Sequence, residues 1–265
     1  MNMKEYYSVV PGEKPLDRMV TDGGFTGIFR SICCIGDSLS SGEFESLDAN
    51  GSVVYHDMFE FSWGQFIARD TGATVYNFSR GGMTAKEYIE SFAEANGFWD
   101  TDKLCRCYIV ALGVNDVFGL NQEIGTVSDM NPDENGNYKD TFASYYGRLV
   151  KRIKDMNPDS YFFFMSMPKY GDGGDPRREA HAALLYDFTK VFSRSYVIDL
   201  YKYAPVYDAE FKSHFFMSGH MNPAGYLLTA RMVESCIDFI IRSNPEHFSK
   251  IGYIGTPYDN VNYKS

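Results

Sequence analysis

The stretch "CCIGDSLSSGEF" (residues 33–44) decides how the rest of the chain is interpreted. An apolar run ends at Gly36, and a serine follows after one residue, between a carboxylate and a leucine. Two explanations fit this local pattern. Either Ser38 only caps the helix that follows, or the end of a strand presents it at the rim of a sheet as a nucleophile. What stands at the other strand ends decides between them.

Short apolar runs rich in β-forming residues recur along the chain, as expected for strands covered on both faces. They lie at 31–36, 74–78, 107–112, 160–167 and 195–200. Helical patterns separate these runs. Capping-box spacings at Ser62 and Thr84 predict two helix starts, and apolar periodicity predicts helices over 141–156 and 177–192. Asn222-Pro223 starts a last helix, which ends at Asn244-Pro245.

Strand and helix alternate five times, which predicts one three-layer α/β domain with a five-stranded, mostly parallel sheet over residues 1–265. Residues 1–30 form an N-terminal extension and 246–265 a C-terminal tail. Two segments, 39–59 and 118–140, do not fit the alternation. The second is rich in Gly, Asn and Asp, and we expect it to be a long, functional loop.

Composition excludes several classes of protein. The formal net charge of −10 argues against nucleic acid or an anionic membrane as a partner. No stretch approaches the roughly 18 apolar residues of a membrane helix, and the N-terminus lacks a signal-peptide pattern. We therefore expect a soluble, cytoplasmic protein, unless a leader has been removed. The five cysteines show no CxxC spacing, so we expect them to be buried and reduced, with no metal site.

Polar residues and glycines stand just beyond the expected strands. Ser38 follows the first strand, Gly82 the second and Asn115 the third, while His220 precedes the last helix. Each alone has an ordinary structural explanation, such as a cap, a turn or a surface histidine. Because sites in parallel sheets form beyond the carboxyl ends of the strands, the four can converge. Together they supply a nucleophile, a backbone amide, a side-chain amide and a base, which acyl transfer to a serine requires.

The motifs "IGDSLS", "NFSRGGMT", "LGVND" and "GHMNPAGY", in that order, resemble the four sequence blocks of the SGNH (GDSL) hydrolase family over residues 31–243. The resemblance implies a flavodoxin-like α/β/α sandwich that hydrolyses esters, from lipids to acetylated sugars, without a metal or organic cofactor. Carried over by position, Ser38 matches the nucleophile and one oxyanion donor, Gly82 and Asn115 match the other two donors, and His220 matches the general base.

One position departs from the family pattern. The family has an aspartate three residues before the histidine, where this chain has Met217. Methionine cannot accept the imidazole Nδ1–H as a carboxylate does. Three alternatives remain. His220 forms a dyad with Ser38 and relies on a backbone carbonyl or on Ser218, or a substitute acid orients it, with Asp208 and Glu210 as candidates. In the third alternative the enzyme is impaired. Asp37, beside the nucleophile, is interpreted as structural.

We therefore expect a serine ester hydrolase that acts through an acyl-enzyme intermediate on small-molecule esters, with deacetylation of a carbohydrate-type substrate preferred. The alternative is a catalytically impaired SGNH-fold binding protein, which Met217 would explain. A flavodoxin-like nucleotide-binding module is a third possibility, although the chain has no evident phosphate loop.

Overall fold

A five-stranded sheet occupies the centre of the computed structural model, which describes residue 7 and residues 9–253. The strands are β1 (Ser31–Gly36), β4 (Thr74–Asn77), β5 (Cys107–Ala111), β6 (Tyr161–Met165) and β7 (Ser195–Ile198). All neighbouring strands are parallel, in the order β4-β1-β5-β6-β7. The five predicted strands are confirmed. The chain reverses its direction of winding between β1 and β5, so a crevice is expected beyond the carboxyl ends of these two strands.

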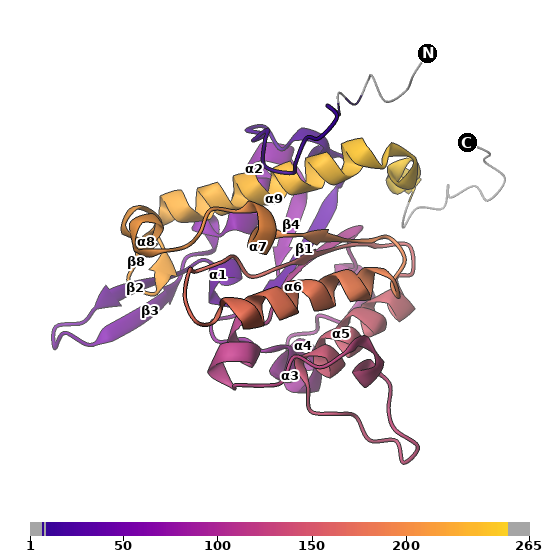
Figure 1. The fold of residues 1–265 in the computed structure, drawn as a ribbon, viewed down its shortest axis with the longest axis horizontal. Coiled ribbons are helices and arrows are strands. Elements are labelled where there is room, and N and C mark those ends of the chain that lie inside the picture. Colours follow the sequence, from indigo (N-terminus) through magenta and orange to yellow (C-terminus); the bar gives the residue numbers. More distant parts are fainter. Residues whose placement is uncertain (1–6, 8, 254–265) are drawn as a thin grey trace.

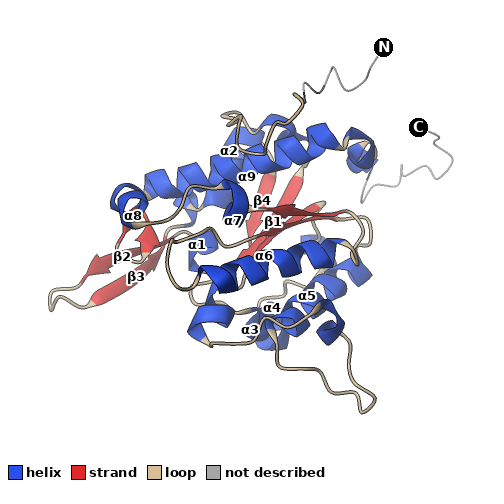
Figure 2. Ribbon diagram, in the orientation of Figure 1, coloured by secondary structure: helices blue, strands red, loops and turns tan. Residues whose placement is uncertain are grey.

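Helices cover both faces of the sheet (Figures 1 and 2). One face packs against α2 (Trp63–Thr71) and α9 (Pro223–Ser243), the other against α5 (Phe142–Met156) and α6 (Asp175–Thr189). Alternate residues of β1 divide between the two layers. Ile32 and Cys34 are buried in the α2/α9 core, whereas Cys33 and Ile35 are buried in the α5/α6 core. The three-layer α/β/α architecture is confirmed.

The predicted helix starts agree with the observed caps. The side chains of Ser62, Thr84, Thr141 and Asn222 each accept a hydrogen bond from the backbone N–H three residues on. The segment after Thr84 is less regular than predicted. It consists of α3 (Ala85–Glu87), one π-helical turn and α4 (Ala93–Ala95).

The two segments that did not fit the alternation differ from each other. Residues 38–57 form α1 (Ser38–Ser41) and an antiparallel hairpin of β2 (Glu43–Leu47) and β3 (Val53–Asp57), which projects from the body of the molecule (Figure 2). Residues 118–140 are mostly irregular, as expected. The remaining short elements are α7 (Leu200–Tyr203), α8 (Ala209–Phe215), β8 (Phe216–Met217), β9 (His220–Met221) and the 3₁₀ and π turns Gly24–Ile28, Phe59–Phe61, Tyr88–Phe92, Thr101–Lys103, Asn115–Gly119, Val127–Met130, Pro245–Phe248 and Ile251–Tyr253.

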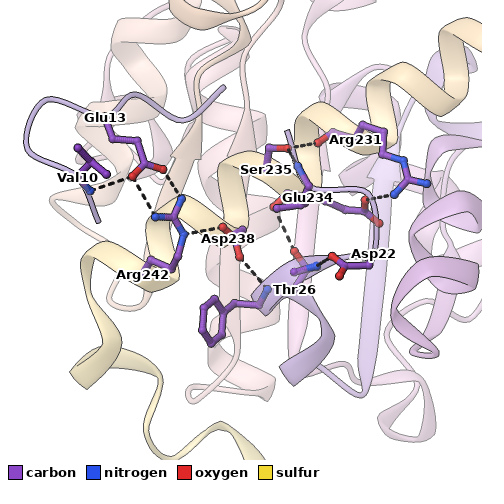
Figure 3. Close-up of polar contacts among 12 residues, drawn as sticks. Val10, Glu13, Asp22, Thr26, Arg231, Glu234, Ser235, Asp238 and Arg242 are labelled. Atoms are coloured by element: carbon purple, nitrogen blue, oxygen red, sulfur yellow. Dashed lines mark hydrogen bonds and ion pairs between the residues drawn. The ribbon is translucent and has the colours of Figure 1, made fainter. Parts of the chain in front are cut away.

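The described part of the N-terminal extension is bound to α9 by buried charges (Figure 3). The Arg242 guanidinium, only 3% exposed, donates to Glu13 at 2.6 Å and to Asp238 at 2.7 Å. The other oxygen of Asp238 accepts the backbone N–H of Phe25 at 2.9 Å. Hydrogen bonds from Arg242 lower the pKa of Glu13, although burial opposes this. The extension is therefore fastened to the core through an ion-paired triad.

Two expectations from composition can be compared with the structure. All five cysteines are buried and free, as predicted. Within the described residues, none of the helices combines the length and the apolar character needed to span a bilayer.

Candidate active site

Ser38 stands where β1 turns sharply into α1. A side chain at position 36 would overlap Ser40, so only glycine fits the end of the strand. Asp37 then adopts an extended conformation, and its carboxylate accepts the N–H of Leu39 at 3.1 Å. The helix cap is therefore Asp37, which supports its structural interpretation and leaves the partly exposed Ser38 hydroxyl for other chemistry. Ser38 is also the first residue of α1, so its N–H has no partner within the helix.

Gly82 and Asn115 lie on the loops that follow β4 and β5, the two neighbours of β1. Gly82 has a φ of +71°, a left-handed conformation that favours glycine. The Asn115 side-chain amide donates to the Met83 carbonyl at 3.1 Å, and the Asp116 carboxylate accepts the N–H of Ala85 at 2.8 Å. The two loops are thereby held together.

His220 lies on β9, in the small hairpin that precedes α9, and β9 contacts α1. Both ring nitrogens face glutamates of β2. Nδ1 lies 2.5 Å from Oε1 of Glu45, and Nε2 lies 3.1 Å from Oε1 of Glu43. All three side chains are at most 15% exposed. The Tyr55 ring of β3 meets the imidazole nearly edge-on, with centroids 5.7 Å apart.

The carboxylate at Nδ1 corrects one expectation. Neither Asp208 nor Glu210 fills the place left by Met217. Asp208 caps α8 by accepting the N–H of Phe211 at 3.0 Å, and Glu210 is exposed in the first turn of the same helix. The carboxylate beside Nδ1 is that of Glu45 instead, because the hairpin directly after α1 folds back over β9. The other suggested partner, Ser218, hydrogen-bonds to Glu45.

The two glutamates have opposite ionisation tendencies. Burial raises the pKa of Glu45, but hydrogen bonds from His220, Ser218 and the N–H of Gly219 outweigh it, so the pKa lies below its usual value. Glu45 is therefore a carboxylate at neutral pH. Burial raises the pKa of Glu43 above its usual value; proximity to His220 opposes this shift, and the neighbouring carboxylates of Asp57 and Glu45 add to it. Burial also raises the pKa of Asp37 to about 7 and that of Asp116 to about 6.

A cavity of about 80 Å³ adjoins α1 on the side of β5 and β6. Its apolar lining includes Leu39, Trp63, Met165, Met167, Leu200 and Met221. A volume of this size holds only a small group, a few water molecules in extent. As for metals, no cluster of three or more His, Cys, Asp or Glu side chains within residue 7 and residues 9–253 is arranged to hold an ion.

Residues 34–228 match the sequence model of the GDSL-like Lipase/Acylhydrolase family, which covers most of the chain. The chain belongs to this family. A comparison with curated proteins finds no match. Membership of an acylhydrolase family supports ester hydrolysis as the general activity of this GDSL-like protein, and it agrees with the resemblance inferred from the four motifs.

Several solved structures share the fold of this GDSL-like protein. A family two carbohydrate esterase from Clostridium thermocellum, in complex with cellohexaose, is 16% identical with a TM-score of 0.58, over 82% of this chain and 65% of that one. A family 2 esterase with a carbohydrate-binding domain from Corynascus thermopiles (Myceliophthora fergusii) is 14% identical with a TM-score of 0.54, over 78% and 65%. A family 3 carbohydrate esterase from Clostridium thermocellum is 13% identical with a TM-score of 0.52, over 80% and 97%. The chain thus spans about two thirds of the length of the family two enzymes.

Sequence reasoning missed Glu43, Glu45 and Tyr55 in this GDSL-like protein. A signal for them was present. Charged and apolar residues alternate over Glu43-Phe44-Glu45, "VVYHD" begins with β-forming residues, and the short segment between the two runs contains Asn50-Gly51, which together make a hairpin pattern. In such a strand, residues two apart share a face. Nothing local indicated that this face would meet a histidine 175 residues later.

Proposed function

We propose that the protein hydrolyses carboxylic esters with Ser38 as nucleophile, His220 as general base and Glu45 as the acid that orients the base. The observation that carries the proposal is the 2.5 Å contact between Glu45 and Nδ1 of His220, which supplies the carboxylate that Met217 cannot. An ionised acceptor at Nδ1 fixes the proton on that nitrogen. Nε2 is then the nitrogen that can accept a proton from Ser38, once Glu43 and the proton that it shares with Nε2 have left.

In the proposed reaction, Ser38 Oγ attacks the ester carbonyl carbon and its proton passes to Nε2 of His220. The negative oxygen of the tetrahedral intermediate accepts hydrogen bonds from the N–H groups of Ser38 and Gly82 and from the Asn115 amide. The bond to the alcohol oxygen breaks as Nε2 returns the proton to that oxygen. Water then attacks the acyl-enzyme by the same route, releasing the acid and restoring Ser38.

Two observations support small esters, with acetylated carbohydrates preferred. The cavity of about 80 Å³ adjoins Leu39, the residue after Ser38, and has room for a short acyl group. Structures of similar fold include carbohydrate esterases of families 2 and 3, one of them in complex with cellohexaose.

One observation favours the alternative, a non-catalytic binding protein. Glu43 occupies Nε2 of His220, the nitrogen that Ser38 needs, so the proton can transfer only after the Glu43 carboxylate has moved away. A protein in which Glu43 never leaves Nε2 would keep the fold and the site but would not hydrolyse an ester.

Hydrolysis of p-nitrophenyl acetate separates the two functions. The esterase predicts activity in the native protein that falls by about three orders of magnitude or more in Ser38→Ala and His220→Ala, since residues that act as a unit are lost together. The matched control is Ser46→Ala, an exposed serine of β2 outside the proposed machinery. Activity equal in all four proteins would rule out the serine mechanism.

A further inference from the structure

The Glu43 carboxylate lies between the proposed base and the proposed oxyanion site. Its Oε1 is 3.1 Å from Nε2 of His220, and its Oε2 is so close to Gly81 that any side chain there would overlap it. Gly81 directly precedes Gly82, whose N–H is a proposed oxyanion donor. The carboxylate therefore lies across the place where an ester must bind.

The backbone of Glu43 is held firmly in this position. Its carbonyl accepts the hydroxyl of Tyr226 at 2.6 Å, and its neighbour Phe44 is buried against Tyr226 and Phe61 with ring centroids 5.5 and 5.8 Å apart. Since the backbone is fixed, only rotation of the side chain can clear the site. The carboxylate therefore stays close to any ester that binds there.

The chemistry of the proposed reaction identifies which part of the substrate meets Glu43. Nε2 of His220 returns its proton to the leaving oxygen, so the alcohol part of the ester must lie beside Nε2. Glu43 contacts the same nitrogen in the free protein. A carboxylate accepts hydrogen bonds from hydroxyl groups and repels anions. A free hydroxyl on the alcohol, next to the carbon that carries the ester oxygen, could donate a hydrogen bond to the Glu43 carboxylate and replace its contact with Nε2.

Tyr55 adds an apolar surface at the same place. It pairs with Glu45 across the hairpin, so its side chain lies on the face that carries both glutamates. Tyr55 is 58% exposed although its ring contacts His220. An aromatic ring open to solvent beside the base offers a flat surface to the C–H groups of a ring-shaped alcohol.

We propose that Glu43 and Tyr55 form the subsite for the alcohol part of the substrate and select a polyhydroxylated, ring-shaped alcohol with a free hydroxyl next to the ester. This inference rests on the proposed function. Hydroxyl-bearing substrates draw the Glu43 side chain away from Nε2. The proton that the two groups share then passes to solvent, and Nε2 can act as the base for Ser38. Esters without that hydroxyl leave Glu43 on Nε2, where it competes with Ser38.

The test compares kcat/KM for three esters: p-nitrophenyl acetate, glycerol monoacetate and a methyl glucoside acetylated on one ring hydroxyl, so that a free hydroxyl lies on the neighbouring carbon. In Glu43→Ala we expect kcat/KM for the two hydroxylated esters to fall roughly 10- to 100-fold, the value of one hydrogen bond to a charged group. For p-nitrophenyl acetate it should rise, because the competitor at Nε2 is gone. Tyr55→Ala should raise KM for the glucoside and spare glycerol monoacetate, which has no ring.

Glu60→Ala is the matched control, since this exposed glutamate lies just beyond the hairpin and outside the site; it should behave as the native protein. Glu43→Gln keeps a hydrogen-bond acceptor but loses the charge, so its kcat/KM values should lie between those of the native protein and those of Glu43→Ala. This variant also keeps the test valid if Glu43→Ala does not fold. Equal changes for all three esters, with Ser38-dependent activity intact, would overturn this inference alone. Absence of any Ser38-dependent hydrolysis would overturn the proposed function together with it.

Discussion

Two substitutions of Glu45 separate what its charge contributes to kcat from what its orientation of His220 contributes. Oε1 of Glu45 accepts two hydrogen bonds, from Nδ1 of His220 at 2.5 Å and from the N–H of Gly219 at 3.1 Å. In Glu45→Gln, the fixed Gly219 N–H should hold the amide with its oxygen toward Nδ1. The proton then stays on Nδ1 and Nε2 remains the basic nitrogen. Only the charge that stabilises the imidazolium is lost.

The magnitude follows from that difference. A hydrogen bond to a charged group contributes about 1.5–3 kcal/mol and one between neutral groups about 0.5–1.5 kcal/mol, so the amide should cost about 1–2 kcal/mol in the transition state. This corresponds to a fall in kcat of roughly 5- to 30-fold at 25 °C. In Glu45→Ala the orientation is lost as well, and we expect a fall on the order of 10²- to 10⁴-fold.

The assay is the steady-state hydrolysis of p-nitrophenyl acetate by the native protein, Glu45→Gln, Glu45→Ala and Glu210→Ala. The last variant removes a carboxylate that the sequence offers as a candidate acid. The structure places Glu210 on α8, so the kcat of this variant should equal the native value. The reasoning would be refuted by a Gln variant as poor as the Ala variant, by an inactive Glu210→Ala, or by no effect at Glu45.

Three further predictions concern the oxyanion site and the core. Asn115→Ala should lower kcat by about 10²- to 10³-fold with little change in KM, measured with the same ester; an unchanged kcat would exclude Asn115 as a donor. Burial, with Asp70 nearby, raises the pKa of Glu234 from 4.5 to about 8, so the native state keeps a proton that the unfolded chain releases. The free energy of unfolding should therefore fall as the pH rises from 4.5 to 8. Glu234→Gln should remove that fall and raise the free energy of unfolding at pH 8 by on the order of 2–4 kcal/mol, measured by urea titration. A native protein that is equally stable at both pH values would contradict this prediction. Arg242→Ala leaves Glu13 and Asp238 as unpaired buried charges and should cost about 3–5 kcal/mol in the same titrations; a loss below 1 kcal/mol would mean that water reaches the triad.

Much of the fold and part of the site could be predicted because the signals are local. The five strands are short apolar runs, and the helix starts carry their own caps, such as Thr141 and Asn222. Parallel strands place their carboxyl ends at one edge, so Ser38, Gly82 and Asn115 could be assigned to neighbouring loops from their order alone.

The partners of His220 could not be predicted in the same way. They depend on how the hairpin of β2 and β3 folds over β9, which is a contact between distant segments. Asp208 and Glu210 are the candidates that the sequence offers as a substitute acid, because they lie shortly before His220 in the chain. A carboxylate just after the nucleophile, Glu45, was closer in space than either.

The most direct test of the account is covalent labelling of the serine by a fluorophosphonate, followed by peptide mass spectrometry. Ser38 Oγ displaces fluoride from phosphorus, so the label reports an activated nucleophile and does not depend on which ester is the natural substrate. The account predicts one label, on Ser38, that forms much more slowly in His220→Ala and is absent in Ser38→Ala. An unlabelled Ser38, or labelling at the same rate without His220, would contradict it.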